Sequence, residues 1–185
     1  LNIPIISYLF NLGKCRNCKT KIGWSYFVVE LLTGCLFFLS YLRYGLSIEF
    51  CAYIIFYSSL IIIFFTDLKE YLILDKITIP FSIIGLILVF FNFSPFEVNI
   101  LESITGGVAG YAVIYFIRFL FFKIRKVEGM GLGDAKLFLL IGVWLGIKSI
   151  YIILMVSALA GSICGVFIIY YYKKNKNFQI PYGCF

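Results

Sequence analysis

The chain contains no histidine and few charged residues. Charged residues make up 14% of its 185 residues, whereas an ordinary soluble domain has about 25%. The missing histidine excludes His-dependent serine and cysteine catalysis, the H-E-x-x-H zinc proteases and haem ligation by His. The shortage of charge excludes a soluble globular enzyme, because too few side chains are available to cover a water-facing surface. Since 62% of the residues are hydrophobic and only 4 are proline, disorder is excluded too, and the chain belongs in a bilayer.

Long apolar runs predict the transmembrane helices. A spanning helix needs about 20 largely apolar residues. Six runs approach that length, and small residues in the fourth and sixth would let helices pack closely. The sequence therefore predicts an all-α, polytopic membrane protein with about six transmembrane helices, at residues 25–42, 50–66, 77–93, 103–122, 135–147 and 149–172.

The positive charges predict the orientation. The net charge is +7, and Lys and Arg gather in the N-terminal segment, in the 67–76 and 123–134 loops and after residue 172. The positive-inside rule places these segments in the cytoplasm. We read the positive charge as this membrane bias and expect no nucleic-acid partner, since no basic stripe interleaved with aromatic residues is present.

Two acidic residues are the strongest candidates for chemistry. A carboxylate buried in a membrane protein costs several kcal/mol unless it is paired or protonated. Asp67 follows the second apolar run, and Asp134 opens the fifth, after glycines at 129, 131 and 133. Both lie at the cytoplasmic face by the charge rule. The alternatives are an interfacial charge for Asp67 and a helix N-cap for Asp134.

Four motifs, in order along the chain, resemble those of the type IV prepilin peptidases, the membrane aspartyl proteases that process type IV pilins and pseudopilins. Residues 128–137, which read EGMGLGDAKL, resemble the G-x-G-D signature of the family. Residues 67–75, which read DLKEYLILD, resemble its motif of two aspartates eight positions apart, although Leu74 stands where proline is usual. Residues 2–30 resemble the cytoplasmic segment before the family's second span, and residues 180–183 the segment before its last helix.

The resemblance implies a function and an extent. It implies an aspartic endopeptidase in the bacterial inner membrane that cleaves prepilin leaders at the cytoplasmic face, with Asp67 and Asp134 as the catalytic pair. Gly131, Gly133 and Lys136 belong to the same motif. The family often also methylates the new N-terminus with S-adenosylmethionine, while the peptidase reaction needs no cofactor. The resemblance also implies that this chain is an internal piece of a longer enzyme.

The remaining motif residues are predicted to have structural rather than catalytic roles. Cys15 and Cys18 have the spacing of half a four-cysteine zinc site, and we expect them to be reduced, close together and without a complete site, because two ligands are too few. Asp75 could be a catalyst or the N-cap of the third span, and the N-cap is the favoured prediction. Glu30, one turn into the first span, is expected to reach the interface or to hold a partner.

The predicted organisation has three parts: a cytoplasmic segment over residues 1–24, a membrane-embedded peptidase domain over 25–172, and a cytoplasmic tail over 173–185. The expected partners are prepilin or pseudopilin substrates and membrane lipids. Two other classes remain open on the residues alone. An ion- or proton-coupled transporter would also place acids in spans, although it would usually show repeated halves. A non-catalytic assembly protein would have no need of both aspartates.

Overall fold

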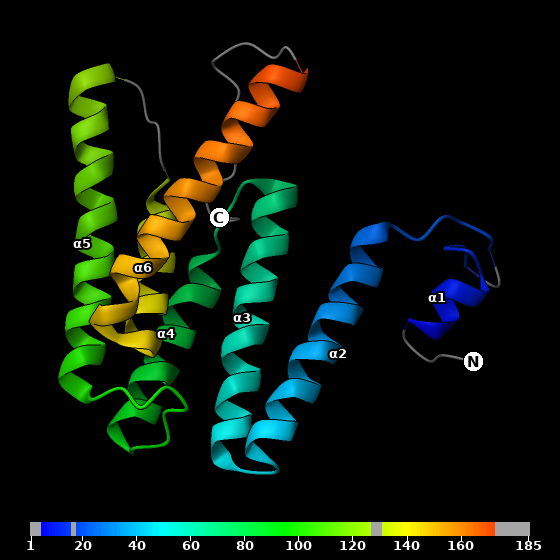
Figure 1. Ribbon diagram of the computed structural model, residues 1–185, viewed down its shortest axis with the longest axis horizontal. Coiled ribbons are helices and arrows are strands. Elements are labelled where there is room, and N and C mark those ends of the chain that lie inside the picture. Colours follow the sequence, from blue (N-terminus) through cyan, green and yellow to red (C-terminus); the bar gives the residue numbers. More distant parts are fainter. Residues whose placement is uncertain (1–4, 16–17, 127–130, 173–185) are drawn as a thin grey trace. The chain divides into compact units, whose positions relative to one another are not determined.

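The protein is built from helices (Figure 1). The computed structural model describes the backbone of residues 5–15, 18–126 and 131–172, and side chains as far as Ile163 except that of Arg125. Residues 2–4, 128–130 and 173–185, which contribute to three of the sequence motifs and the predicted tail, lie outside this range. The described residues contain no strand, only an isolated bridge between Lys14 and Lys21, which confirms the all-α prediction. The helices are α1 (Ile6–Phe10), α2 (Trp24–Tyr44), α3 (Ile48–Glu70), α4 (Asp75–Phe90), α5 (Ile100–Arg125) and α6 (Leu132–Tyr172).

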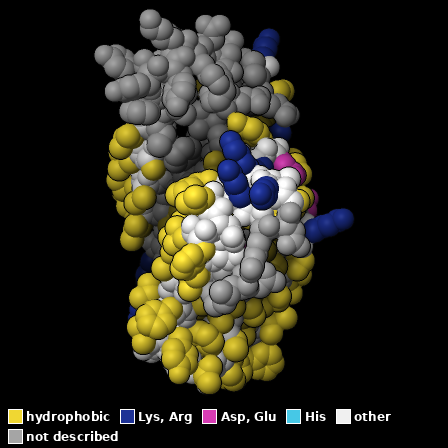
Figure 2. Space-filling view, turned by 90° about the vertical axis from the view of Figure 1, so that its right-hand side faces the viewer, with side chains coloured by type: hydrophobic (Ala, Val, Ile, Leu, Met, Phe, Trp, Pro, Cys, Tyr) yellow, Lys and Arg dark blue, Asp and Glu magenta, His cyan; other side chains and the backbone are white. Residues whose placement is uncertain are grey.

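Four helices of the described region are long and apolar enough to cross a membrane, namely α2, α3, α5 and α6. Helix α4 covers the third predicted span but has only 16 residues, so it is about 24 Å long and shorter than a bilayer core of about 30 Å. The fifth and sixth predicted spans are the two parts of α6. Hydrophobic side chains cover much of the surface drawn in Figure 2, as lipid contact requires. The chain is a multi-pass membrane protein.

The helices fall into two compact units, Leu1–Ile61 and Ile62–Phe185. In the first unit, Tyr44 of α2 and Tyr53 of α3 pack with ring centroids 4.8 Å apart, and the Tyr44 hydroxyl donates to that of Tyr53 at 3.2 Å. Tyr8 packs on Phe27 with ring centroids 5.1 Å apart, which ties the N-terminal segment to α2. Aromatic contacts therefore connect each helix of this unit to the next.

In the second unit, α4 and α5 pack against the first part of α6 (Figure 1). The indole Nε1 of Trp144 donates to the carbonyl of Phe81 in α4 at 2.9 Å. On the α5 side, the hydroxyl of Ser103 donates to the carbonyl of Val143 at 2.6 Å, and it is fully buried there. These two hydrogen bonds cross between helices at adjacent residues of α6. The first part of α6, which begins with the G-x-G-D motif, is thus fixed from two sides.

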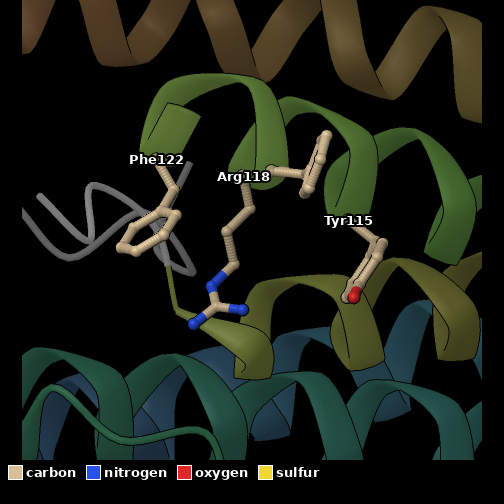
Figure 3. A pocket seen from close by; sticks show the side chains of 4 residues that line it. Tyr115, Arg118 and Phe122 are labelled. Carbon is tan, nitrogen blue, oxygen red and sulfur yellow. The ribbon is translucent and has the colours of Figure 1, made fainter. Parts of the chain in front are cut away.

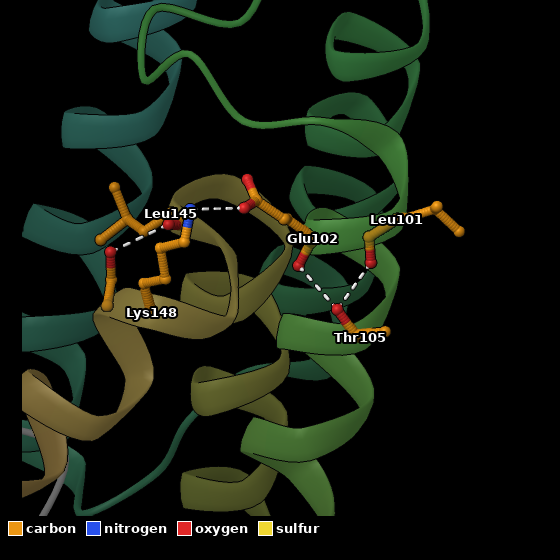
Figure 4. A network of polar contacts seen from close by, with 6 residues as sticks. Leu101, Glu102, Thr105, Leu145 and Lys148 are labelled. Carbon is orange, nitrogen blue, oxygen red and sulfur yellow. Dashed lines mark hydrogen bonds and ion pairs between the residues drawn. The ribbon is translucent and has the colours of Figure 1, made fainter.

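Helix α6 breaks at Gly146, whose φ of 74° and ψ of 174° are not helical. A side chain at a φ in this region is strained, so glycine suits the break. The break lies next to an ion pair in which Lys148 Nζ is 2.7 Å from Glu102 Oε1 of α5 (Figure 4). The break in the helix corresponds to the division of the apolar sequence into two runs near residue 148.

Candidate active site

Asp67 is a buried acid near the end of α3. Its side chain lies in the second unit and is 5% exposed. The helix ends three residues later, and Tyr71, which has a φ of 53°, donates its backbone N–H to the carbonyl of Asp67 at 2.9 Å. Since a buried carboxylate is costly unless it is paired or protonated, the role of an exposed surface charge does not account for Asp67. The interpretation of Asp67 as an interfacial charge is therefore disfavoured.

Asp134 is the third residue of α6, where unsatisfied backbone N–H groups are available. Its carboxylate Oδ2 accepts a hydrogen bond from the backbone N–H of Gly131 at 3.1 Å. The side chain thus reaches back to the residue before the helix, as the acidic member of a capping box does. Asp134 caps the start of α6 from inside the helix rather than from the N-cap position, and its side chain is only partly exposed.

The fold brings these two carboxyl groups into electrostatic contact. The charge of Asp67 acts directly on Asp134, although the two residues come from the end of α3 and the start of α6. Two negative charges in one site raise the free energy of the state in which both carboxyl groups are ionised. A shared proton on a pair of aspartates is the arrangement by which aspartic proteases activate water.

Gly133 brings the chain between α3 and α4 against the start of α6. A Cβ atom on Gly133 would lie 2.8 Å from the Cβ of Ile73, closer than real side chains approach. Ile73 is buried, with 9% exposure. By contrast, a Cβ on Gly131 would find only ordinary contacts at 3.7 Å. The two glycines of the motif therefore have different tasks, and Ile73 is a site residue that the sequence reasoning missed.

Asp75 is paired with Lys136. The prediction that Asp75 is an N-cap was wrong, because α4 has Leu74 at that position and Asp75 is the first helical residue. The carboxylate of Asp75 instead meets Lys136 Nζ at 2.5 Å. The N-cap prediction considered only the residues next to Asp75 in the sequence, where a loop precedes a helix. The actual partner lies 61 residues away in sequence, which only the tertiary structure reveals.

Comparison with known proteins identifies the chain. A profile described as the type IV leader peptidase family matches residues 54–166, and one for the bacterial peptidase A24 N-terminal domain matches residues 1–44. The chain belongs to the type IV leader peptidase family. The family assignment favours a peptidase over the transporter and assembly-protein alternatives, and it includes both Asp67 and Asp134 in the matched region.

Several curated relatives carry the name prepilin leader peptidase/N-methyltransferase. The protein of Neisseria gonorrhoeae is 37% identical over 165 residues, which cover 89% of this chain and 57% of the relative. That of Aeromonas salmonicida (strain A449) is 33% identical over 182 residues, covering 98% and 62% respectively. That of Dichelobacter nodosus is 35% identical over 162 residues, covering 88% and 56%. This chain thus spans less than two thirds of the length of these relatives. No solved structure matches it significantly.

Cys15 and Cys18 lie together in the N-terminal segment, as expected. Hydrogen bonds from the side chain and backbone of Thr20, and from the thiol of Cys15, lower the pKa of the Cys18 thiol from 9.0 to about 7. The Cys18 Sγ and Thr20 Oγ1 atoms are 3.0 Å apart. Both cysteines are free thiols, and the described residues include no group of three or more His, Cys, Asp or Glu that could hold a metal. Two thiols alone do not fit a structural zinc ion.

Glu30 holds a partner, but that partner is backbone. Its Oε2 accepts a hydrogen bond from the N–H of Ile5 at 2.8 Å, within the first unit. Ile5 has a φ of 63°, an uncommon conformation for a branched residue. Glu30 therefore fastens the start of the N-terminal segment to α2.

A cavity of about 140 Å³ opens along α5 and is lined by Tyr115, Arg118, Phe119 and Phe122 (Figure 3). The Arg118 side chain points from α5 toward α6. The lining residues within the described part of the chain come from one face of one helix, so these residues form no cradle around a nucleoside. These residues do not fit S-adenosylmethionine, and we assign none of the described residues to that cofactor.

Proposed function

We propose that this chain carries the catalytic pair of a membrane aspartic endopeptidase that removes the leader peptide of type IV prepilins or pseudopilins. The observation that carries the proposal is the electrostatic contact between buried Asp67 and partly buried Asp134 in a chain of the leader peptidase family. The names of the relatives supply the substrate class. The positive-inside bias supports an inner-membrane location with the pair facing the cytoplasm.

The proposed reaction uses the two aspartates as one unit. One carboxylate takes a proton from water while the other, protonated carboxyl donates a hydrogen bond to the scissile carbonyl. The water oxygen then bonds to the carbonyl carbon, the C–N bond breaks, and the departing amine takes up a proton. Because the proton is shared, the acid and base roles belong to the pair.

The relatives' names support a second activity, N-methylation of the new N-terminus. That reaction would use S-adenosylmethionine as the methyl donor. Mass spectrometry of the cleaved pilin, with and without S-adenosylmethionine, tests this extension separately. A product that gains one methyl group only when the donor is present supports it, and a product that is never methylated contradicts it.

The test of the peptidase is cleavage of a synthetic prepilin by the full-length protein in membranes. Asp67→Asn and Asp134→Asn should each abolish cleavage, because each variant keeps only one of the two carboxyl groups that share the proton. Glu70→Gln is the matched control: it neutralises an exposed carboxylate one turn after Asp67 and should leave cleavage intact. Cleavage by either aspartate variant at the wild-type rate would reject the proposed pair.

A further inference from the structure

We propose that the Asp75–Lys136 ion pair is a positioning device that holds Asp134 in register with Asp67. This inference rests on the proposed peptidase function. Lys136 lies two residues after Asp134 in the first turns of α6, and Asp75 is the first residue of α4. The ion pair connects residues near the starts of two helices rather than neighbours on one helix.

The short chain between α3 and α4 makes this connection relevant to Asp67. Only residues 71–74 separate the end of α3 from the start of α4, so Asp67 and Asp75 lie on either side of one turn. Within that turn, Ile73 packs directly on Gly133. The start of α6 is therefore held at two points. Gly133 contacts the turn, and Lys136 holds the helix that follows it.

The pair is poorly suited to a purely stabilising role. The side chains of Lys136 and Asp75 are 29% and 54% exposed, and ion pairs with this much solvent contact contribute little to stability. The hydrogen bond from Trp144 to Phe81 already holds α4 and α6 together further along. What the ion pair adds is local: it fixes the first turn of α6, which carries Asp134, relative to the turn that follows Asp67.

The position of a reacting group affects the chemical step far more than it affects folding. A displacement of about 1 Å can lower a rate about 100-fold. We therefore expect loss of the ion pair to lower kcat while leaving the amount of folded protein and KM nearly unchanged. Neither Asp75 nor Lys136 takes part in proton transfer in this scheme.

The experiment is a double-mutant cycle on the full-length protein with a synthetic prepilin, with rates expressed per enzyme molecule. Asp75→Asn and Lys136→Gln should each lower kcat about 10- to 100-fold, with KM within about twofold. The double variant should be no worse than the poorer single variant, because both changes remove the same contact. Asp75→Glu and Lys136→Arg keep the charges and should retain most of the activity.

Lys148→Gln is the matched control, since it removes an ion pair of the same unit, the one with Glu102, away from the aspartates. Additive losses, a change in KM alone, or a fall in protein amount with normal activity per molecule would each overturn the positioning role. If Asp67→Asn still cleaves, the proposed function fails as well. If it does not cleave but Asp75→Asn behaves as wild type, only the positioning role fails.

Discussion

Replacing Gly133 by alanine tests the close contact between α6 and the turn after Asp67. The new Cβ would lie 2.8 Å from the Cβ of Ile73, whereas ordinary contacts begin near 3.4 Å. The turn or the start of α6 must therefore move by about 0.6 Å. Both atoms sit on or beside rigid backbone, so a rotamer change does not relieve the overlap. Because a shift of about 1 Å can cost about 100-fold in rate, we expect kcat to fall about tenfold.

The expected stability change is smaller than this kinetic effect. Overpacking costs about 1–3 kcal/mol, but alanine in a helix is favoured over glycine by about 1 kcal/mol. The net destabilisation of Gly133→Ala should then be about 0–2 kcal/mol. Thermal unfolding in detergent and cleavage of a synthetic prepilin, measured on the same preparation of the full-length protein, separate the two effects.

Gly131→Ala and Ile73→Ala make the test specific. A Cβ on Gly131 meets nothing closer than 3.7 Å, so Gly131→Ala should lower kcat less than Gly133→Ala. Ile73→Ala should fail to rescue Gly133→Ala, because the atom in the way is the Cβ, which alanine keeps. Equal losses at the two glycines, or rescue by Ile73→Ala, would refute the reasoning.

Three further predictions concern other parts of the fold. Thr20→Val removes the first cause of the lowered Cys18 pKa, so the pKa should rise from about 7 toward 9.0 and the thiolate should become scarcer at neutral pH. Iodoacetamide labelling of Cys18 should then slow severalfold at pH 7 and be unchanged at high pH, where both proteins are fully ionised. Trp144→Phe removes the indole donor to α4 and should cost about 1 kcal/mol or more in thermal unfolding. Gly142→Val would place a side chain in the facing backbone of α5 and should sharply reduce folded protein, whereas Gly34→Val, with nothing within 4 Å, should not.

Much of the fold could be predicted from the sequence because long apolar runs have one main solution in a membrane. The six runs correspond to α2, α3, α4, α5 and the two parts of α6. The division near Lys148 corresponds to the break at Gly146. The length of α4 was harder to predict from the sequence. The apolar run continues to residue 93, but the helix ends at Phe90, where the chain turns through Asn92 with a φ of 58°.

The candidate site was predictable only in part. The two aspartates stand out because acids beside apolar spans are rare and costly. That both lie at the cytoplasmic face stays a prediction of the charge rule. The electrostatic interaction between Asp67 and Asp134 is the structural observation that links the two residues. The Asp75–Lys136 pair and the packing of Ile73 on Gly133 were missed, since both are contacts between segments distant in sequence. The sequence did contain one indication of the ion pair: Asp75 and Lys136 carry opposite charges near the starts of two predicted spans on the same membrane face.

The position of the aspartates at helix ends has a physical reason. Inside a membrane helix every backbone N–H is already bonded, so a carboxylate placed there finds no backbone donor. The start of α6 leaves backbone N–H groups without helical partners, and Asp134 accepts a hydrogen bond from the N–H of Gly131, just before the helix. Gly133, two residues on, leaves room for Ile73 and hence for the turn that follows Asp67. The spacing of the G-x-G-D motif thus meets two needs in one helical turn: a donor for one carboxylate and the close approach of the segment carrying the other.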